Sequence, residues 1–217
     1  MKIVLFNATG LEKCPEWFSP RQNLCVSAIK YSCAAIQISY NRLLSTLTHW
    51  DEEKYDQDSI FLSLTDAWSV VDNFYRLHSI LRRFPGARRF QLNEIDRTLR
   101  IQNETLRHYF QHMEAFADPN TINAGLIGGI SWMRAEDSEF RSVKIICVFF
   151  GSVKNSEIQM TQIPQDGHLI TRPVGHVSIT IGHQMTCLSD AAHSLKDLVV
   201  RFSEAMPHFR EDKRILK

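Results

Sequence analysis

The sequence predicts an α+β fold that is mainly helical, with an antiparallel helical bundle and a small antiparallel β-sheet segment inserted before a C-terminal helix. Two observations predict it. Up to about residue 117, apolar residues recur at spacings of three and four, which is the period of an amphipathic helix. After Pro119, glycines and runs of β-branched and aromatic residues take over, and these favour strands.

The composition limits the classes of protein to which the chain can belong. Its 217 residues fit one domain, and 44% hydrophobic residues suffice for a buried core. Lys+Arg at 25 against Asp+Glu at 24 leaves a net charge of +1, which argues against a dedicated high-affinity duplex binder but allows a small basic patch. No stretch approaches the roughly 20 apolar residues of a membrane span, so no membrane partner is expected.

The five cysteines indicate reduced thiols. Their number is odd and no CxxC pair is present, which is typical of a cytosolic protein rather than a disulfide framework. Cys25 and Cys33 are eight apart on a predicted helix, so their Cα atoms are expected roughly 12 Å apart, too far to bridge. We therefore predict a cytoplasmic protein.

The first predicted helix runs from Asn23 to about His49, after breaks at Pro15 and Pro20, while residues 3–6 form either a short strand or an extended arm. Its apolar positions are Cys25, Val26, Ile29, Cys33, Ile36, Tyr40, Leu43 and Leu44. A charged connector over residues 51–54 leads to the second helix.

The second predicted helix covers residues 59–84 and ends at Pro85-Gly86. Asp72 and Arg76, four apart, are expected to pair on its surface. Its apolar stripe is Phe61, Leu64, Trp68, Val71, Tyr75, His78 and Leu81.

The third predicted helix runs from Asn93, a plausible N-cap with Asp96 three residues on, to about Ala117. Asn103 lies on its apolar stripe and needs hydrogen-bond partners there, since burying an unsatisfied amide costs roughly 1–3 kcal/mol. The apolar members of this stripe are Ile95, Leu99, Leu106, Phe110 and Met113.

The β-rich part is predicted to begin with tight-turn backbone at Gly125, Gly128 and Gly129, leading into a packed Trp132. The strands expected are Ile130–Met133, Val143–Phe150 as the best buried candidate, Ile158–Ile163 and His176–Ile181. An amphipathic helix follows over Ser189–Met206, with the stripe Ala192, Leu195, Leu198, Val199 and Phe202. We divide the single domain 1–217 into a helical core over 23–118, a β-rich elaboration over 119–185 and a C-terminal helix over 186–210.

The third helix carries the run Arg107-His108-Tyr109-Phe110-Gln111-His112. It resembles the Arg–polar–x3–His signature of the HEPN superfamily, and its place after two other bundle helices is similar too. The resemblance covers about residues 23–117 and leaves the β-rich part outside. It implies a helical bundle that often dimerises through its motif helices and, in active members, cleaves RNA without a metal or other cofactor.

On this resemblance, Arg107 and His112 are the expected catalytic residues of an endoribonuclease of the toxin or defence type. A permanently cationic arginine holds a phosphate through two hydrogen bonds, and a histidine transfers protons near neutral pH. Residues five apart lie ~140° apart around one helix, so a site shared by two motif helices favours a homodimer. The supporting residues expected are Asn103, Glu104 and His108, and those expected to bind RNA are Arg97 and Arg100.

Other interpretations stay open. The chain is alternatively a non-catalytic helical module that binds a nucleotide, a nucleic acid or a protein, with the motif as a relic and its charged residues solvated. Glu104, His108 and His112 lie in one helical column and would also suit a metal site, to which His78 would contribute. The sequence does not name the RNA, an antitoxin or another regulatory partner.

Overall fold

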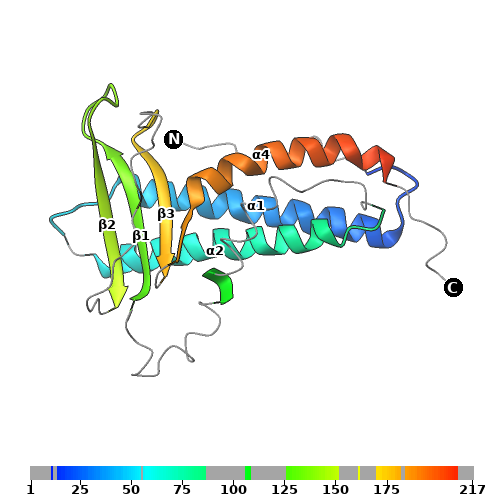
Figure 1. The fold of residues 1–217 in the computed structure, drawn as a ribbon, viewed down its shortest axis with the longest axis horizontal. Helices are drawn as coiled ribbons and strands as arrows, with labels where there is room; N and C mark the ends of the chain where they lie inside the picture. Colours follow the sequence, from blue (N-terminus) through cyan, green and yellow to red (C-terminus); the bar gives the residue numbers. More distant parts are fainter. Residues whose placement is uncertain are drawn as a thin grey trace.

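The computed structural model is mainly helical with a small antiparallel sheet placed before the last helix, as the sequence predicts. It describes residues 11, 14–54, 56–86, 106–108, 126–151, 161, 170–181 and 184–209. The expectations for residues 3–6 and for most of the third helix lie outside this part of the chain. Figure 1 shows two long helices side by side, with the strands crossing them at the end where the two helices connect.

Helix α1 (Pro20–Thr48) begins three residues earlier than predicted. Ser19 is its N-cap: the Ser19 hydroxyl accepts from the Gln22 amide, and the Gln22 side chain accepts from the Ser19 amide at 3.0 Å. Proline is well suited to the first helical position because its missing N–H would have no partner there. Pro20 therefore starts the helix instead of breaking the chain.

Helix α2 (Gln57–Arg82) begins two residues before the predicted start and returns antiparallel along α1. Its N-cap Asp56 accepts hydrogen bonds from the amides of Asp58 and Ser59. The predicted apolar positions of α1 are buried except for Cys25, which is half-buried. The predicted stripe of α2 is right only in part: Leu64, Val71 and Leu81 are buried, whereas Trp68, Tyr75 and His78 are half-buried and Phe61 is 41% exposed. The buried face of α2 also includes Ile60, Ala67, Val70, Phe74 and Leu77.

Polar contacts fix the register of this α1–α2 hairpin. Asp66 of α2 is fully buried, and Arg42 of α1 donates from Nε to both of its carboxylate oxygens, at 2.8 and 3.0 Å. Three residues earlier on α1, the Ser39 hydroxyl donates to Ser69 at 2.8 Å. A buried carboxylate needs a charged partner, so a shift of α2 along α1 would leave Asp66 buried without one.

The sheet has four antiparallel strands in the order β2-β1-β3-β4. They are β1 (Leu126–Ala135), β2 (Val143–Gly151), β3 (Val174–Ile181) and β4 (Gln184–Cys187). The sequence analysis missed β4, which is too short for an alternating pattern to be visible. Of the predicted strand at 158–163 only Thr161 is described, and its amide donates to the Ser131 hydroxyl at 2.8 Å.

The structure places the most hydrophobic run of the β-rich part at an edge. The prediction of Val143–Phe150 as the best buried strand is wrong in burial, although the strand itself forms. β2 is an outer strand of the sheet; Ile145 is 39% exposed, and Ile146 is buried. A continuous apolar run therefore marks a strand here without marking a central one.

Gly128 and Gly129 lie inside β1, so the prediction of a turn at these two residues is also wrong. A Cβ on Gly129 would lie 2.3 Å from the Phe149 ring of β2, and a Cβ on Gly128 would lie 3.3 Å from Leu64 of α2. Gly129 thus leaves room for the Phe149 ring, and Gly128 lets β1 approach α2 closely. Trp132 follows them and is fully buried, as predicted, with its ring 5.8 Å from that of Trp50.

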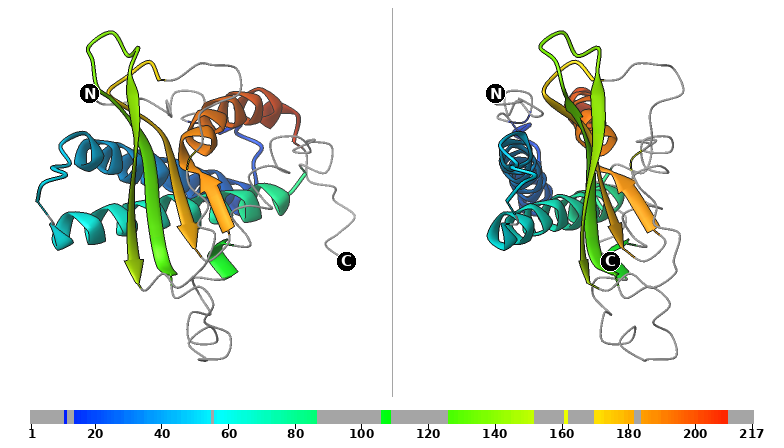
Figure 2. Two further views of the ribbon diagram at one scale, coloured as in Figure 1. Left: turned by 60° about the vertical axis from the view of Figure 1, so that its left-hand side comes forward. Right: turned by 90° about the vertical axis from the view of Figure 1, so that its left-hand side faces the viewer.

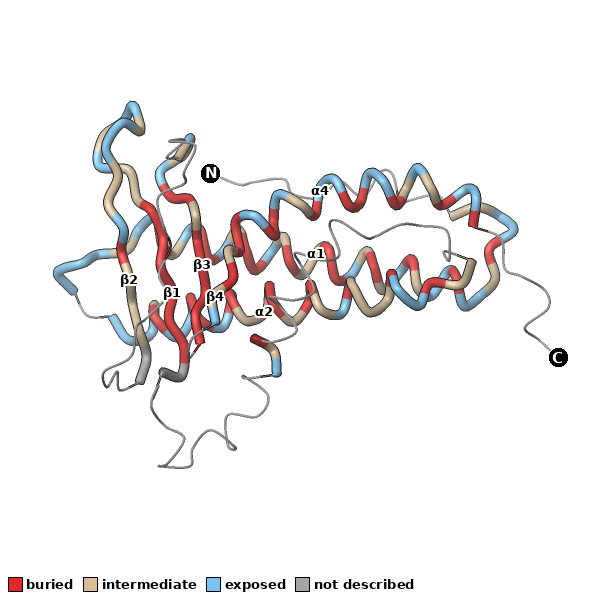
Figure 3. The backbone as a smooth tube through the Cα atoms, viewed as in Figure 1, coloured by how far each residue is buried: buried red, intermediate tan, exposed pale blue. Residues whose placement is uncertain are grey.

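Helix α4 (Leu188–Ala205) packs against both β3 and α1, and the short 3₁₀ turn η3 (Met206–His208) follows it. Tyr40 of α1 donates to the Ser189 hydroxyl at 2.9 Å, and Ser189 in turn accepts from the Val177 amide of β3 at 2.9 Å. The predicted apolar stripe of this helix is buried throughout. Figures 2 and 3 show that α4 and the turn between α1 and α2 lie on opposite sides of the sheet. The buried side of α4 faces α1. Among the described helices, none is long and apolar enough to cross a membrane.

Thiol reactivity is predicted to follow burial. Desolvation raises the pKa of Cys33 to about 12 and that of Cys187 to about 11, and it raises the pKa of Cys147 as well. Because the thiolate is the nucleophile, native protein at about pH 8.5 should alkylate Cys33 and Cys187 slowest, as read by mass spectrometry. Protein unfolded in urea is the control, and equal rates for Cys33 in both states would contradict the burial.

The Arg42–Asp66 pair predicts unequal costs for its two truncations. Arg42 is about half exposed, whereas Asp66 is fully buried. Arg42→Ala leaves a buried carboxylate without its charged partner and should lower the free energy of unfolding by about 2–3 kcal/mol. Asp66→Ala leaves an arginine that water can solvate, so it should lower this free energy by less. Urea denaturation measures both. A larger loss for Asp66→Ala would show that the carboxylate contributes mainly through its other contacts.

Candidate functional site

The predicted motif meets the hairpin through residues 106–108, which form a helical turn. Leu106 is fully buried, as its place on the apolar stripe predicts. This buried leucine holds the turn against the rest of the protein, so Arg107 lies across α2 with its side chain 26% exposed.

The guanidinium of Arg107 is bound by two residues of α2. Its Nε donates to Asp72 Oδ1 at 3.0 Å, and its Cζ lies 4.0 Å from the centre of the Tyr75 ring. The first contact is a charge-assisted hydrogen bond, and the second is a cation–π contact, which an arginine makes through the flat face of its guanidinium. Asp72 and Tyr75 are three apart, so one face of α2 presents both.

Asp72 also binds a second arginine. Arg76 Nη2 lies 2.7 Å from Asp72 Oδ2, which confirms the predicted pair four residues apart on α2. Two guanidiniums therefore share one carboxylate, and the cluster of Asp72, Arg76 and Arg107 carries a net positive charge. Arg76 is 56% exposed, so this charge is greatest on the solvent side.

Of the other predicted site residues, the structure describes His108. His108 is exposed and lies next to Arg107 in sequence. The remaining candidates lie outside the described residues: Arg97, Arg100, Asn103, Glu104 and His112. The structure therefore shows the surroundings of Arg107, and its pairing with His112 stays a prediction.

The metal interpretation gains no support from the residues in view. Within the described ranges, no group of three or more His, Cys, Asp or Glu side chains is placed to hold a metal ion. Two of the predicted ligands, Glu104 and His112, lie outside these ranges, so the column that suggested the site stays a prediction.

Sequence reasoning missed the role of Asp72 and Tyr75 as partners of Arg107. It assigned Asp72 only to Arg76, and it counted Tyr75 among the apolar positions. The available signal was their spacing: an acid, an aromatic ring and a base at i, i+3 and i+4 share one helical face. What the sequence does not supply is which cation crosses from another element to that face.

Comparisons of the chain with models of protein families, with characterised proteins and with solved structures found no significant match.

We predict that Arg107 and Asp72 are energetically coupled. Arg107→Ala should lower the free energy of unfolding by about 1–2 kcal/mol, because it removes a partly buried ion pair and a cation–π contact. In a double-mutant cycle, Asp72→Ala should cost less when Arg107 is already absent. Arg82→Ala, at an exposed arginine in the last turn of α2, is the matched control and should change stability little. Strictly additive losses would show that the pair does not hold the turn.

Proposed function

We propose that the chain is a HEPN-like helical module that binds a partner without cleaving RNA. The observation that carries this proposal is the environment of Arg107. Its guanidinium is bonded to Asp72, rests on Tyr75 and is three-quarters shielded from solvent. An arginine in these contacts holds its own segment to α2, which is a structural task.

A catalytic role would use an arginine whose Nε edge is already bonded to an acid, which leaves the edge of its two terminal nitrogens for a phosphate. To bind a phosphate with two parallel hydrogen bonds, the guanidinium presents two N–H groups on one edge. The Nε of Arg107 is already committed to Asp72, and the acid competes with a phosphate for the same cation. Catalysis gains only from interactions that strengthen in the transition state, and a neutralised arginine offers less of that gain.

The class of partner follows from charge and surface. A net charge of +1 gives no broad attraction for nucleic acid, whose binding depends on phosphate neutralisation by lysine and arginine. The described surface instead exposes large apolar side chains along α1, and these favour a protein partner. A protein-binding module is therefore the function that the described geometry supports best.

A metal-independent endoribonuclease of the toxin or defence type is the second candidate, and the shared carboxylate favours it. Because Arg76 and Arg107 both bind Asp72, the cluster keeps a positive charge that would attract a phosphate of RNA. In this proposal Arg107 and Arg76 orient the phosphate. His112 takes a proton from a ribose hydroxyl or gives one to the leaving oxygen, in a homodimer that pairs the motif helices.

An RNA-cleavage assay in EDTA separates the two functions. We expect the wild-type protein to leave varied RNAs intact, and Arg107→Ala to lower the melting temperature without changing that result. Cleavage that survives EDTA, persists in Arg82→Ala and disappears in both Arg107→Ala and His112→Ala would instead establish the endoribonuclease. Cleavage abolished by EDTA would point to the metal interpretation.

A further inference from the structure

One face of α1 carries a straight row of large apolar side chains in solvent. Leu24, Tyr31 and Ile38 are spaced by seven and are 70%, 66% and 63% exposed. Trp17, seven residues before Leu24 and just ahead of the N-cap, is 59% exposed. Seven residues fall ~20° short of two helical turns, so this row turns only slowly around the helix, as the seam of a two-helix coiled coil does.

The large side chains of the row are uncharged, and smaller side chains separate them. The residues between its large members, on the same side of the helix, are small: Ser27, Ala28, Ala34 and Ala35. Arg21 and Lys30 lie roughly 80–100° around the helix from Tyr31. Arg42, which does lie near the row, is neutralised by Asp66. Such a face suits a second apolar helix at close approach and gives a phosphate backbone nothing to bind.

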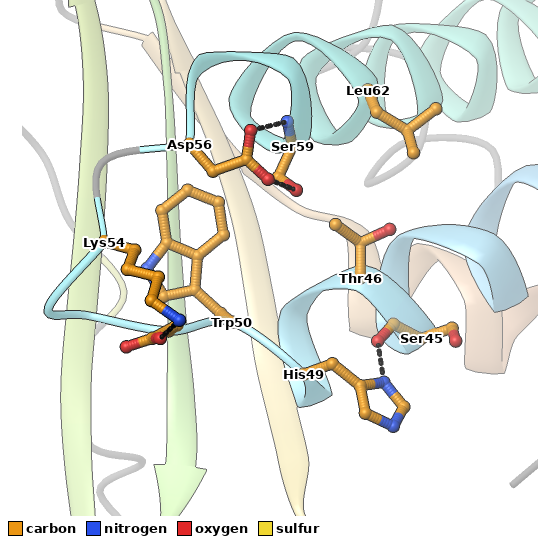
Figure 4. A pocket seen from close by; sticks show the side chains of 9 residues that line it. Ser45, Thr46, His49, Trp50, Lys54, Asp56, Ser59 and Leu62 are labelled. Carbon is orange, nitrogen blue, oxygen red and sulfur yellow. Dashed lines mark hydrogen bonds and ion pairs between the residues drawn. The ribbon is translucent and has the colours of Figure 1, made fainter.

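The row ends in a hollow. Beyond Ile38, α1 and the start of α2 enclose a polar depression of about 420 Å³. Ser45 lies one heptad after Ile38, and Thr46 and Leu62 line the depression with it, as Figure 4 shows. Leu62 is 41% exposed, so the apolar surface continues onto α2 at this point.

We propose that a second copy of this chain docks on the row, with α1 packed antiparallel against α1 of the other copy. The spacing is self-complementary. When Leu24 of one copy lies opposite Ile38 of the other, the two Tyr31 side chains meet at the two-fold axis, and the small residues between let the helices approach closely. Trp17 precedes the N-cap, so the helical register does not fix its place, but it lies at the end of the row that faces Ser45 and the hollow of the other copy.

The buried area is adequate for a modest dimer. The four large side chains would remove roughly 500 Å² of surface from solvent on each copy. A standard interface buries ~800 Å² per partner, and Leu62, Ser45 and the small residues of the row supply much of the remainder. Aromatic side chains at the centre of a patch contribute most of the binding energy, which places Tyr31 first. This dimer differs from one through the motif helix, and it holds whichever proposed function is correct.

Sedimentation velocity across the micromolar range tests the proposal, with circular dichroism to confirm folding. Wild type should dimerise reversibly, and Tyr31→Glu should raise the dissociation constant at least about tenfold. Leu24→Glu/Ile38→Glu should abolish the dimer. Leu24→Lys/Ile38→Glu, changed at the same two positions, should keep it, because only an antiparallel pair places each lysine opposite a glutamate. Val200→Glu, at an exposed valine of α4, is the control and should dimerise like wild type.

Three results would overturn the proposal. The first is a wild-type protein that stays monomeric at the highest concentration. The second is a dimer that survives both Tyr31→Glu and Leu24→Glu/Ile38→Glu, which would place the interface elsewhere, the motif helix included. The third is loss of the dimer in both double variants, which would exclude the antiparallel arrangement.

Discussion

The antiparallel packing of α1 on α2 is the constraint on which the other described elements depend. Its register is set where Arg42 reaches the buried Asp66, and each later element docks on a surface that this register creates. β1 approaches α2 through the missing side chain of Gly128, and α4 is tied to α1 through Tyr40. The motif turn binds Asp72, six residues or about 1.7 helical turns after Asp66. A shift of one helix would displace the sheet, the last helix and the candidate site together.

The same hairpin determines the contacts of Arg107. The carboxylate that it binds belongs to the same face of α2 as Tyr75 and Arg76, so one helix presents an acid, a ring and a competing base to a turn that comes from elsewhere. A short helical turn with one buried leucine gains a second anchor from these contacts. The charge that remains on the solvent side keeps phosphate binding chemically reasonable, which is why the motif is open to two functions.

The fold class, the two long helices and the last helix are predictable from periodicity, because a helix that buries one face carries apolar residues at a period of 3.6. The predictions that were wrong or incomplete concern residues whose role depends on a contact with another residue or strand. Proline at position 20 signals a break unless Ser19 and Gln22 are recognised as a cap. Val143–Phe150 is as apolar as a central strand, although among the described strands only β1 pairs with it. β4 is too short to show a period. At the site, the arginine was recognised by its spacing from a histidine, but its acid lies 35 residues away on another helix, and only the fold joins them.

The order of elements along the chain bears on how the protein is made. The α1–α2 hairpin is built from contacts between neighbouring elements and is complete before any of the four described strands has left the ribosome, so it is expected to form early. The central pair β1 and β3 must then close a loop that includes β2, and the apolar stripe of α4 finds its place only when β3 is present. Until that moment the surface around Tyr40 is uncovered. A nascent chain stalled before α4 would therefore expose core residues of a hairpin that has already folded, and such species are the ones that chaperones must protect.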